Sequence, residues 1–166
     1  GEPGAQAAAL GAAGERVGAI EELELSPHAG NGESMMAARD GAVDNLRPAV
    51  DTMLCGAVAA VQSVLPAMRE QGSGTILLTA GSGSINPVPF FGALNTAQAA
   101  TRNWAHNLHG ALAGSGVYVA HVAIGVGIGE VAPAPGYPFQ TPAELAALYW
   151  DLHVSRAIPE LVVTGE

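Results

Sequence analysis

The sequence predicts an α/β fold with three layers, in which helices cover both faces of a mainly parallel sheet. Two short apolar runs bounded by glycine, GTILLTA at 74–80 and VYVAHVAIG at 117–125, have the pattern of strands that are covered on both faces. A segment with apolar residues three and four positions apart precedes each run, as expected of a helix. Strands that alternate with helices at these spacings predict parallel pairing through right-handed crossover connections.

The first forty residues carry the weakest pattern. Residues 5–16 favour a helix. The following EELELS, at 21–26, alternates acid and leucine like a strand with one solvated face, and a helix is also compatible with it. SPHAGNGESM, at 26–35, gathers Pro, Gly, Asn and Ser, which is typical of a loop. We therefore expect a short strand and then a loop before the first long helix.

Two long helices with an apolar stripe are predicted next. The first runs from about residue 44 to REQGSG at 69–74, where glycine ends it, and Pro66 should bend its last turn. The second runs over 95–112 and stops at AGSG, 113–116. Their apolar stripes are Val50, Leu54, Val58, Val61, Leu65 and Met68 in the first helix, and Leu94, Ala97, Thr101, Trp104, Leu108 and Leu112 in the second.

The last part of the chain predicts a further helix and strand. In TPAE, at 141–144, Thr is a helix N-cap, Pro takes the first helical position and Glu the third, which together form a capping box. This box opens a helix that carries LAALYWDLH, 145–153. ELVVTGE, at 160–166, can form a last short strand.

Composition limits the classes of protein that the chain can belong to. With 166 residues and 49% apolar content, we expect a single domain over 1–166, of which 1–40 is the least defined part. A net charge of −9 argues against a nucleic-acid partner. The chain contains no lysine, which excludes Schiff-base chemistry. Its one cysteine, Cys55, fits a reducing cytoplasm, and apolar runs interrupted by Gly, Pro or charge predict no membrane span.

Three stretches in register resemble the short-chain dehydrogenase/reductase family, over about residues 25–166. SPHAG stands where that family has an Asn-Asn-Ala-Gly turn, MLCGAVAAVQSVLPAMREQGSGTILLTAG looks like its interface helix and central strand, and ALNTAQAATRNWAHNLHGALAGSGVYVAHVAIG looks like its catalytic helix and next strand. The chain is similar to an atypical bacterial group of this family. The resemblance implies a Rossmann-like parallel sheet, an NAD(P)(H)-dependent oxidoreductase and a cytoplasmic homo-oligomer.

The positions that match the family's catalytic residues carry other residue types. The resemblance puts the family's serine at Gly81, its tyrosine at Leu94, its lysine at Gln98 and its helix asparagine at Met53. Leucine and glutamine cannot exchange a proton with a substrate near neutral pH. We therefore expect this chain to be inactive in the family's standard hydride transfer.

The sequence also lacks the pattern of the cofactor-binding half. A dinucleotide fold begins with a strand, a glycine-rich turn and a helix N-terminus, and nothing before SPHAG has this pattern. We expect the sheet to lack its first βαβ portion and the chain to be truncated or incomplete at its amino end. If NAD(P) binds, the resemblance implies contacts from Ala29, Gly30, Gly125 and Ile128, and binding of no cofactor is the alternative.

Polar residues that converge on one sheet edge are the remaining candidates for a reaction. The carboxyl ends of parallel strands are where open α/β folds bind ligands, and Ser82, Ser84, Asn95 and His28 should gather there. GSGSI runs into a proline-rich loop, which disfavours a Gly-x-Ser-x-Gly nucleophile elbow. His106 and His109 have a spacing that could serve a metal, but no third ligand accompanies them, so we expect no metal site.

Two further functions stay open. In one, the chain is a non-catalytic pseudoenzyme that assembles through the helices over 50–68 and 95–112, as the resemblance implies. Small residues that permit close helix approach are Gly56, Ala57, Ala60, Ala97 and Ala100. In the other, the same edge carries a lyase or isomerase activity that needs no cofactor.

Overall fold

A four-stranded parallel sheet forms the centre of the protein. The computed structural model describes residues 8–10, 12, 20–28 and 36–165. The strands lie in the order β1-β2-β3-β6, and every neighbouring pair is parallel. Their bounds are β1 Glu22–Leu25, β2 Gly74–Gly81, β3 Val117–Ile124 and β6 Glu160–Val163. The predicted strand at 21–26 is therefore confirmed, and its helical alternative is wrong.

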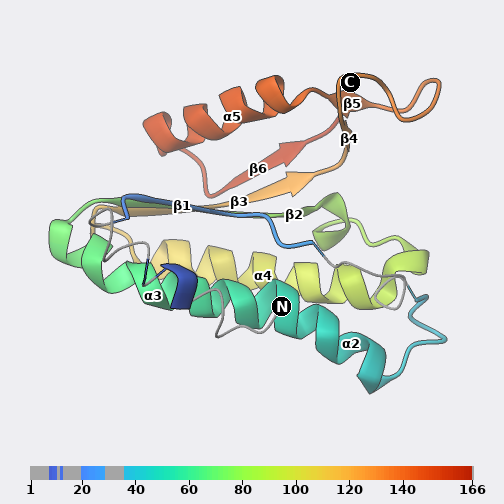
Figure 1. Cartoon of the computed structure of the whole chain (residues 1–166), viewed down its shortest axis with the longest axis horizontal. Helices are drawn as coiled ribbons and strands as arrows, with labels where there is room; N and C mark the ends of the chain where they lie inside the picture. The colour runs from blue at the N-terminus through green and yellow to red at the C-terminus, as the bar shows by residue number, and fades with distance from the viewer. Residues whose placement is uncertain (1–7, 11, 13–19, 29–35, 166) are drawn as a thin grey trace.

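Helices cover the two faces of the sheet unequally. Figure 1 shows α2, α3 and α4 on one face and α5 on the other. Their bounds are α2 Val43–Val50, α3 Gly56–Gln71, α4 Gly92–Ala111 and α5 Pro142–Ser155. The predicted three-layer fold with a parallel sheet is confirmed. Of the helix predicted at 5–16, only residues 8–10 and 12 are described, and they are helical.

The last crossover differs from the prediction that all are right-handed. The strands follow one another across the sheet, yet α4 connects β2 to β3 on one face and α5 connects β3 to β6 on the other (Figure 1). Two crossovers that move in the same direction over opposite faces have opposite hands. After β3 the chain first forms the small parallel pair β4 (Gly127–Ile128) and β5 (Phe139–Gln140), and this detour lets α5 start on the other face.

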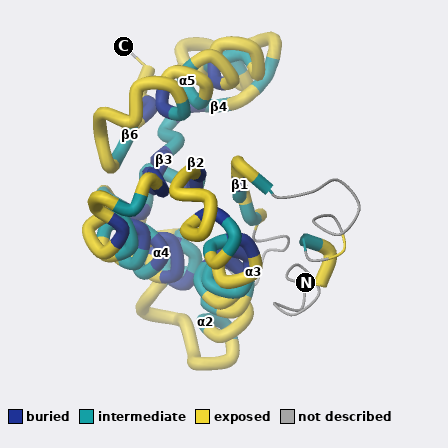
Figure 2. The backbone as a smooth tube through the Cα atoms, turned by 90° about the vertical axis from the view of Figure 1, so that its left-hand side faces the viewer, coloured by how far each residue is buried: buried dark blue, intermediate teal, exposed yellow. Residues whose placement is uncertain are grey.

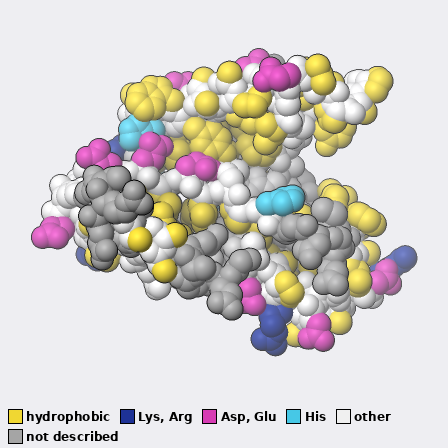
Figure 3. Space-filling model, viewed as in Figure 1, with side chains coloured by type: hydrophobic (Ala, Val, Ile, Leu, Met, Phe, Trp, Pro, Cys, Tyr) yellow, Lys and Arg dark blue, Asp and Glu magenta, His cyan; other side chains and the backbone are white. Residues whose placement is uncertain are grey.

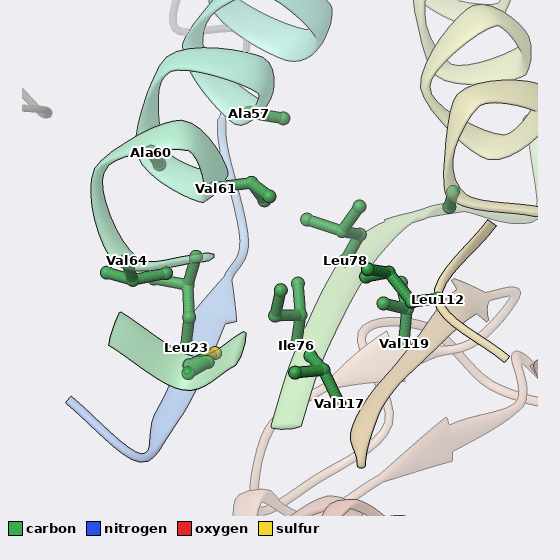
Figure 4. Close-up of a cluster of buried hydrophobic side chains, with 12 residues drawn as sticks. Leu23, Ala57, Ala60, Val61, Val64, Ile76, Leu78, Leu112, Val117 and Val119 are labelled. Carbon is green, nitrogen blue, oxygen red and sulfur yellow. The ribbon is translucent and has the colours of Figure 1, made fainter. Parts of the chain in front are cut away.

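The core consists of two layers of side chains, one on each side of the sheet. Figure 4 shows the first layer, where Ala57, Val61 and Val64 of α3 face Ile76 and Leu78 of β2. The second layer lies under α5. Its buried members are Leu77, Tyr118, Ala120, Val122, Val126, Leu145, Leu152 and Val163. Figure 2 shows the buried segments gathered around the sheet and along the inner sides of the helices.

One continuous helical segment, Val43–Gln71, joins α2 to α3 through a π-helical turn at Asp51–Cys55. By length and composition alone it is apolar enough to cross a membrane, which corrects the expectation that no run would qualify. Only 39% of its most apolar window is buried inside the protein. Because α3 packs against the sheet through Ala57, Val61 and Val64, the segment serves here as a core helix.

Candidate active site

The carboxyl ends of β1, β2 and β3 lie at one edge of the sheet, as predicted. Leu25 pairs with Leu78, and Gly81 pairs with Ile124, so the segments that follow these strands leave the sheet side by side. After β2 the chain makes a 3₁₀ turn at Ser82–Ser84, a second one at Pro89–Phe91, and then enters α4. Helix α4 begins three residues before the predicted start because the second 3₁₀ turn leads directly into it.

Two buried carboxamides occupy the space between this edge and α4. Asn95 and Gln98 are 6% and 8% exposed. The Asn95 Oδ1 atom accepts a hydrogen bond of 2.8 Å from the backbone N–H of Val88, and its Nδ2 donates to Gln98 Oε1 at 3.2 Å. A Cβ atom at Gly83 would lie 2.1 Å from Asn95 Nδ2. Glycine at position 83 therefore leaves the room that the asparagine side chain fills.

The positions that the sequence resemblance assigns to the family's catalytic residues make amide or apolar contacts in the structure. A Cβ atom on Gly81 would lie 3.2 Å from Gln98 Nε2, so the carboxamide of Gln98 faces the end of β2. Leu94 and Met53 belong to an apolar cluster with Ala49, Ala80, Ala93 and Ala97. The backbone carbonyl of Met53, inside the π-helical turn, accepts a hydrogen bond of 3.0 Å from the Thr101 hydroxyl. These contacts provide no acid or base.

The predicted catalytic set is brought together only in part. Ser82, Ser84 and Asn95 surround Gly83, in agreement with the prediction that they share one edge. Ser84 is 7% exposed, and its hydroxyl has no hydrogen-bond partner within the described part of the chain. His28 lies beyond the end of β1 with an exposed side chain, and no hydrogen bond joins it to the described residues of that loop.

The four residues that the resemblance assigns to NAD(P) contacts are described only in part. Ala29 and Gly30 lie outside the described ranges. A Cβ atom on Gly125 would meet the Val163 carbonyl oxygen at 3.0 Å and Ser82 Oγ at 3.1 Å, so this glycine is packed within the protein. Ile128 is 61% exposed. Among the described residues, β1 has no strand on its outer side.

A chain of hydroxyl groups on the α5 face was not foreseen from the sequence. Thr79 Oγ1 donates to Glu24 Oε1 at 3.0 Å, and Ser26 donates to the same carboxylate. Tyr149 OH lies 2.7 Å from Thr79 Oγ1, and because Thr79 has one hydroxyl proton, Tyr149 is the donor in that bond. Burial raises the pKa of the Tyr149 phenol. Tyr149 and Thr79 are 70 positions apart, so no local pattern could reveal the contact.

A second polar network surrounds Glu160, the first residue of the outermost strand β6. The Arg102 guanidinium donates from Nε to Glu160 Oε1 at 2.5 Å and from Nη2 to Oε2 at 2.8 Å. His106 Nε2 and His121 Nδ1 lie 3.0 Å and 3.2 Å from Oε1. The hydrogen bond from Arg102 lowers the pKa of Glu160 to about 2. Burial lowers the pKa of His121, which is fully buried, to about 4.

This network also separates the two histidines that have metal-like spacing. His106 contacts Glu160, whereas the Nδ1 atom of His109 lies 2.7 Å from the Val119 carbonyl oxygen. Within the described residues, no group of three or more His, Cys, Asp or Glu side chains could hold a metal ion.

Comparisons with known proteins agree with this fold. The family model of the short chain dehydrogenases matches residues 3–130. L-sorbose reductase from Gluconobacter frateurii, complexed with NADPH and L-sorbose, matches with a TM-score of 0.83, 18% identity, and coverage of 98% of this chain and 72% of the reductase. Acetoin dehydrogenase from Salmonella typhimurium matches with a TM-score of 0.84, 22% identity, and coverage of 96% and 69%.

A third solved structure carries a bound nucleotide. The 3-oxoacyl-[acyl-carrier protein] reductase from Brucella melitensis with bound NAD matches with a TM-score of 0.77 and 21% identity, over 95% of this chain and 66% of the reductase. At these identities the likeness concerns the fold. No curated protein matches the chain by sequence.

Proposed function

The chain belongs to the short-chain dehydrogenase family, and from this premise we propose that it is a member that does not perform the family's hydride transfer. The proposal rests on the residues that stand at the positions of the family's serine, tyrosine, lysine and asparagine. They are Gly81, Leu94, Gln98 and Met53. The contacts of these four residues are packing contacts or hydrogen bonds between neutral groups.

The main support for this proposal is the pair of carboxamides, Asn95 and Gln98, beside Gly81. Reduction of a carbonyl needs a group that gives up a proton to the developing alkoxide, and general acids do so with a pKa near the working pH. A carboxamide neither loses nor gains a proton in that range. The Asn95–Gln98 pair can therefore hold a polar ligand by hydrogen bonds, but it cannot complete the hydride transfer.

Steady-state assays test this proposal. The full chain is mixed with NADH or NADPH and a carbonyl compound, with L-sorbose and acetoin as first trials because the structural relatives act on these. We expect no consumption of reduced nicotinamide and no saturable change in nicotinamide fluorescence during a binding titration. The Gly81→Ser/Leu94→Tyr/Gln98→Lys variant, which carries the family's serine, tyrosine and lysine at these three positions, is the matched control. Turnover by the wild-type chain at a rate typical of dehydrogenases would overturn the proposal.

A non-catalytic role in an assembly is the second candidate, and the exposed surface of the long helix favours it. Only 39% of the apolar window in Val43–Gln71 is buried, so apolar side chains of this helix stay in contact with water in the single chain. Leu54, Val58 and Leu65 are among the half-buried ones. A second copy of the chain that packs along α3 and α4 would cover them.

The small residues thought to permit this approach do not form that surface. Gly56, Ala57, Ala60 and Ala97 are already buried within the single chain, where they let the helices pack on the sheet, and only Ala100 is half-exposed. Sedimentation of wild type and of Leu65→Glu tests the assembly. We expect a dimer or tetramer that the charged side chain dissociates, and a wild-type monomer at micromolar concentration would remove this candidate.

A lyase or isomerase that needs no cofactor is the third candidate, and the Tyr149 phenol favours it. This phenol is linked by hydrogen bonds to the Glu24 carboxylate of β1 through Thr79, which lies two residues before Gly81 on β2. Such a chain of groups can give or take a proton. If any turnover without cofactor is found, Tyr149→Phe should abolish it while the unfolding transition is retained. Turnover that is unchanged in this variant would assign the acid–base group elsewhere.

We propose a cytoplasmic location without a nucleic-acid partner. Cys55 is a free, exposed thiol, which suits a reducing compartment. Figure 3 shows acidic side chains spread over the visible face, with basic ones at its margins. Such a surface repels a polyanion.

A further inference from the structure

The loop that leads into α2 carries the only Asp–Gly pair of the sequence. Asp40 is followed by Gly41, whereas every other aspartate precedes a larger residue and lies within a helical segment. Those other aspartates are Asp44, Asp51 and Asp151. In an Asp–Gly pair, the backbone nitrogen next to the aspartate side chain belongs to a residue without a Cβ atom, so no side chain shields it.

Both residues of this pair are open to water. The Asp40 side chain is 58% exposed, and Gly41 is exposed as well. Asp40 N–H donates to the Ala37 carbonyl oxygen at 2.9 Å, but the N–H of Gly41 has no hydrogen-bond partner among the described residues. Arg39 Nε donates to Asp40 Oδ2 at 3.1 Å. Because the Arg39 side chain is 86% exposed, this ion pair is weak and leaves the Asp40 carboxyl group accessible.

The fold does not require glycine at position 41. A Cβ atom on Gly41 would lie 3.6 Å from the Ala37 carbonyl oxygen and 3.8 Å from that of Ala38, which are ordinary van der Waals contacts. Gly41 is also not among the glycines with a positive φ. Alanine would therefore fit here without strain, and the effect of the glycine on the neighbouring aspartate can be tested separately from folding.

The loop is attached at both ends. Gly92 N–H, at the start of α4, donates to the Met36 carbonyl oxygen at 3.0 Å, and a Cβ atom on Gly92 would lie 2.5 Å from the Ala38 backbone nitrogen. At the other end, Ala42 N–H donates to Asn45 Oδ1 of α2 at 2.9 Å. An additional main-chain atom between these two attachments changes the path of the loop, because its ends are fixed.

We propose that the Asp40–Gly41 pair is a site of spontaneous isomerisation to isoaspartate, and that this modification loosens the contact between the loop and the start of α4. In the first step, the Gly41 nitrogen attacks the carboxyl carbon of the Asp40 side chain. A carbon–nitrogen bond forms, and the nitrogen proton leaves with the carboxyl hydroxyl group as water. The product is a five-membered cyclic imide that includes the main chain.

Water then opens the imide at one of its two carbonyl carbons. Addition at the carbonyl carbon from the side chain breaks the new bond and restores aspartate. Addition at the main-chain carbonyl carbon gives isoaspartate, in which the main chain passes through the β-carbon of residue 40 and is one atom longer. The two steps release and consume one water molecule and need no oxidant or reductant. Neither residue belongs to the site at Gly81, so the inference does not depend on the proposed loss of hydride transfer.

Peptide mapping of the aged full chain tests the chemistry. The protein is incubated at neutral pH and digested, and isoaspartate is located by mass spectrometry with electron-transfer dissociation. At position 40 we expect isoaspartate to form within about tenfold of the rate in the synthetic peptide MAARDGAV, residues 36–43, because the folded loop leaves the pair accessible. Asp44, Asp51 and Asp151 are the internal controls and should stay unmodified.

Gly41→Ala is the matched variant, because its methyl group hinders the attacking nitrogen and fits the fold. It should slow the reaction at Asp40 by at least about tenfold and leave the urea unfolding midpoint close to that of wild type. An equal rate in Gly41→Ala and wild type would overturn the proposed site. So would a rate in the folded chain more than about a hundredfold below that of the peptide.

Hydrogen exchange tests the structural consequence. The isoaspartate form is separated from the unmodified protein by ion-exchange chromatography, and exchange is compared at single amides. We expect faster exchange at the Gly92 N–H, which bonds to Met36 in the intact loop, and unchanged exchange along β2 as the control. Equal exchange at Gly92 in the two forms would overturn the proposed loosening of the loop.

Discussion

At the scale of single residues, the site depends on glycines that leave room for amide side chains. Gly83 is the tighter of the two such glycines, Gly81 and Gly83, because a Cβ atom at Gly83 would overlap the Asn95 carboxamide. The carboxamide in turn holds the loop before α4 through Val88. Loop and helix are thus fixed to each other by one small residue and one buried amide.

Gly83→Ala should destabilise the protein by about 1–3 kcal/mol, because the added methyl group overlaps Asn95 Nδ2 and forces the side chain or the loop to move. Gly110→Ala is the matched control. It lies within α4 with no atom within 4 Å of its Cβ position, and alanine should stabilise the helix by about 0.5–1 kcal/mol. Urea unfolding measures both. A Gly83→Ala variant as stable as wild type would contradict the packing described.

His121 should make stability fall as the solution is acidified from pH 6.5 to pH 4. Its pKa is about 4 in the folded protein and 6.5 ordinarily, so the unfolded chain binds the proton first in this range. Stability is fully present above pH 6.5 and is lost as the pH falls, by about 3 kcal/mol at most. The neutral ring donates from Nδ1 to Glu160, which leaves Nε2 buried without a partner in the described part of the chain.

Urea unfolding at pH 7 and at pH 4.5 measures this effect. The difference between the free energies of unfolding at pH 7 and pH 4.5 should be smaller in His121→Asn than in wild type. It should persist in His106→Gln, the matched control, because His106 contacts the same carboxylate from a half-exposed position. Equal pH dependence in wild type and His121→Asn would show that another group is responsible. Glu160, with its pKa of about 2, contributes stability that is lost only at lower pH.

At the scale of elements, local patterns predicted the covered strands and the start of α5, because their signals lie within a few neighbouring residues. The capping box at Thr141 is present as predicted, with Glu144 N–H donating to Thr141 Oγ1 at 3.2 Å and Thr141 N–H donating to Glu144 Oε2 at 2.8 Å. The contacts that form the Glu160 network could not be predicted in this way. Arg102 and Glu160 are 58 positions apart, and they meet because α4 packs against β3, the neighbour of β6 in the sheet.

Thr141→Ala should cost about 1 kcal/mol, because the first turn of α5 loses its cap. Thr141→Ser keeps a hydroxyl at this position and should stay close to wild type. Thermal unfolding followed by circular dichroism measures the change. Equal loss in both variants would show that the methyl group of threonine, and not its hydrogen bond, stabilises the helix start.

At the scale of the whole molecule, the family and the parallel three-layer fold followed from an ordered set of motifs, whereas the hand of the last crossover did not. That hand is set by the detour through β4 and β5, which places α5 on the face opposite to α4 (Figure 1). The predicted edge site is also only partly formed, because His28 is exposed beyond β1 while Ser84 and Asn95 are buried under the loop. The order of the residues in the sequence could not reveal this difference in burial.

Glu160→Gln should loosen the attachment of the last strand to the rest of the protein, by about 1.5–3 kcal/mol. The carboxylate lies on β6, and its partners lie on α4 and β3, so its charge joins three elements. Hydrogen exchange should become faster at the β6 amides that face β3, and Glu22→Gln, an exposed acid, is the control. Exchange that increases equally throughout the sheet would indicate general destabilisation.

The Glu160 network also has a consequence for synthesis on the ribosome. Arg102, His106 and His121 all leave the exit tunnel well before the carboxylate that binds them. Until that residue emerges, the Arg102 guanidinium and the two histidine rings lack the carboxylate that they contact in the folded protein, and β3 lacks its outer neighbour β6. Closure of the fold is therefore a late event, and a protein cut before this position should be captured by chaperones or degraded.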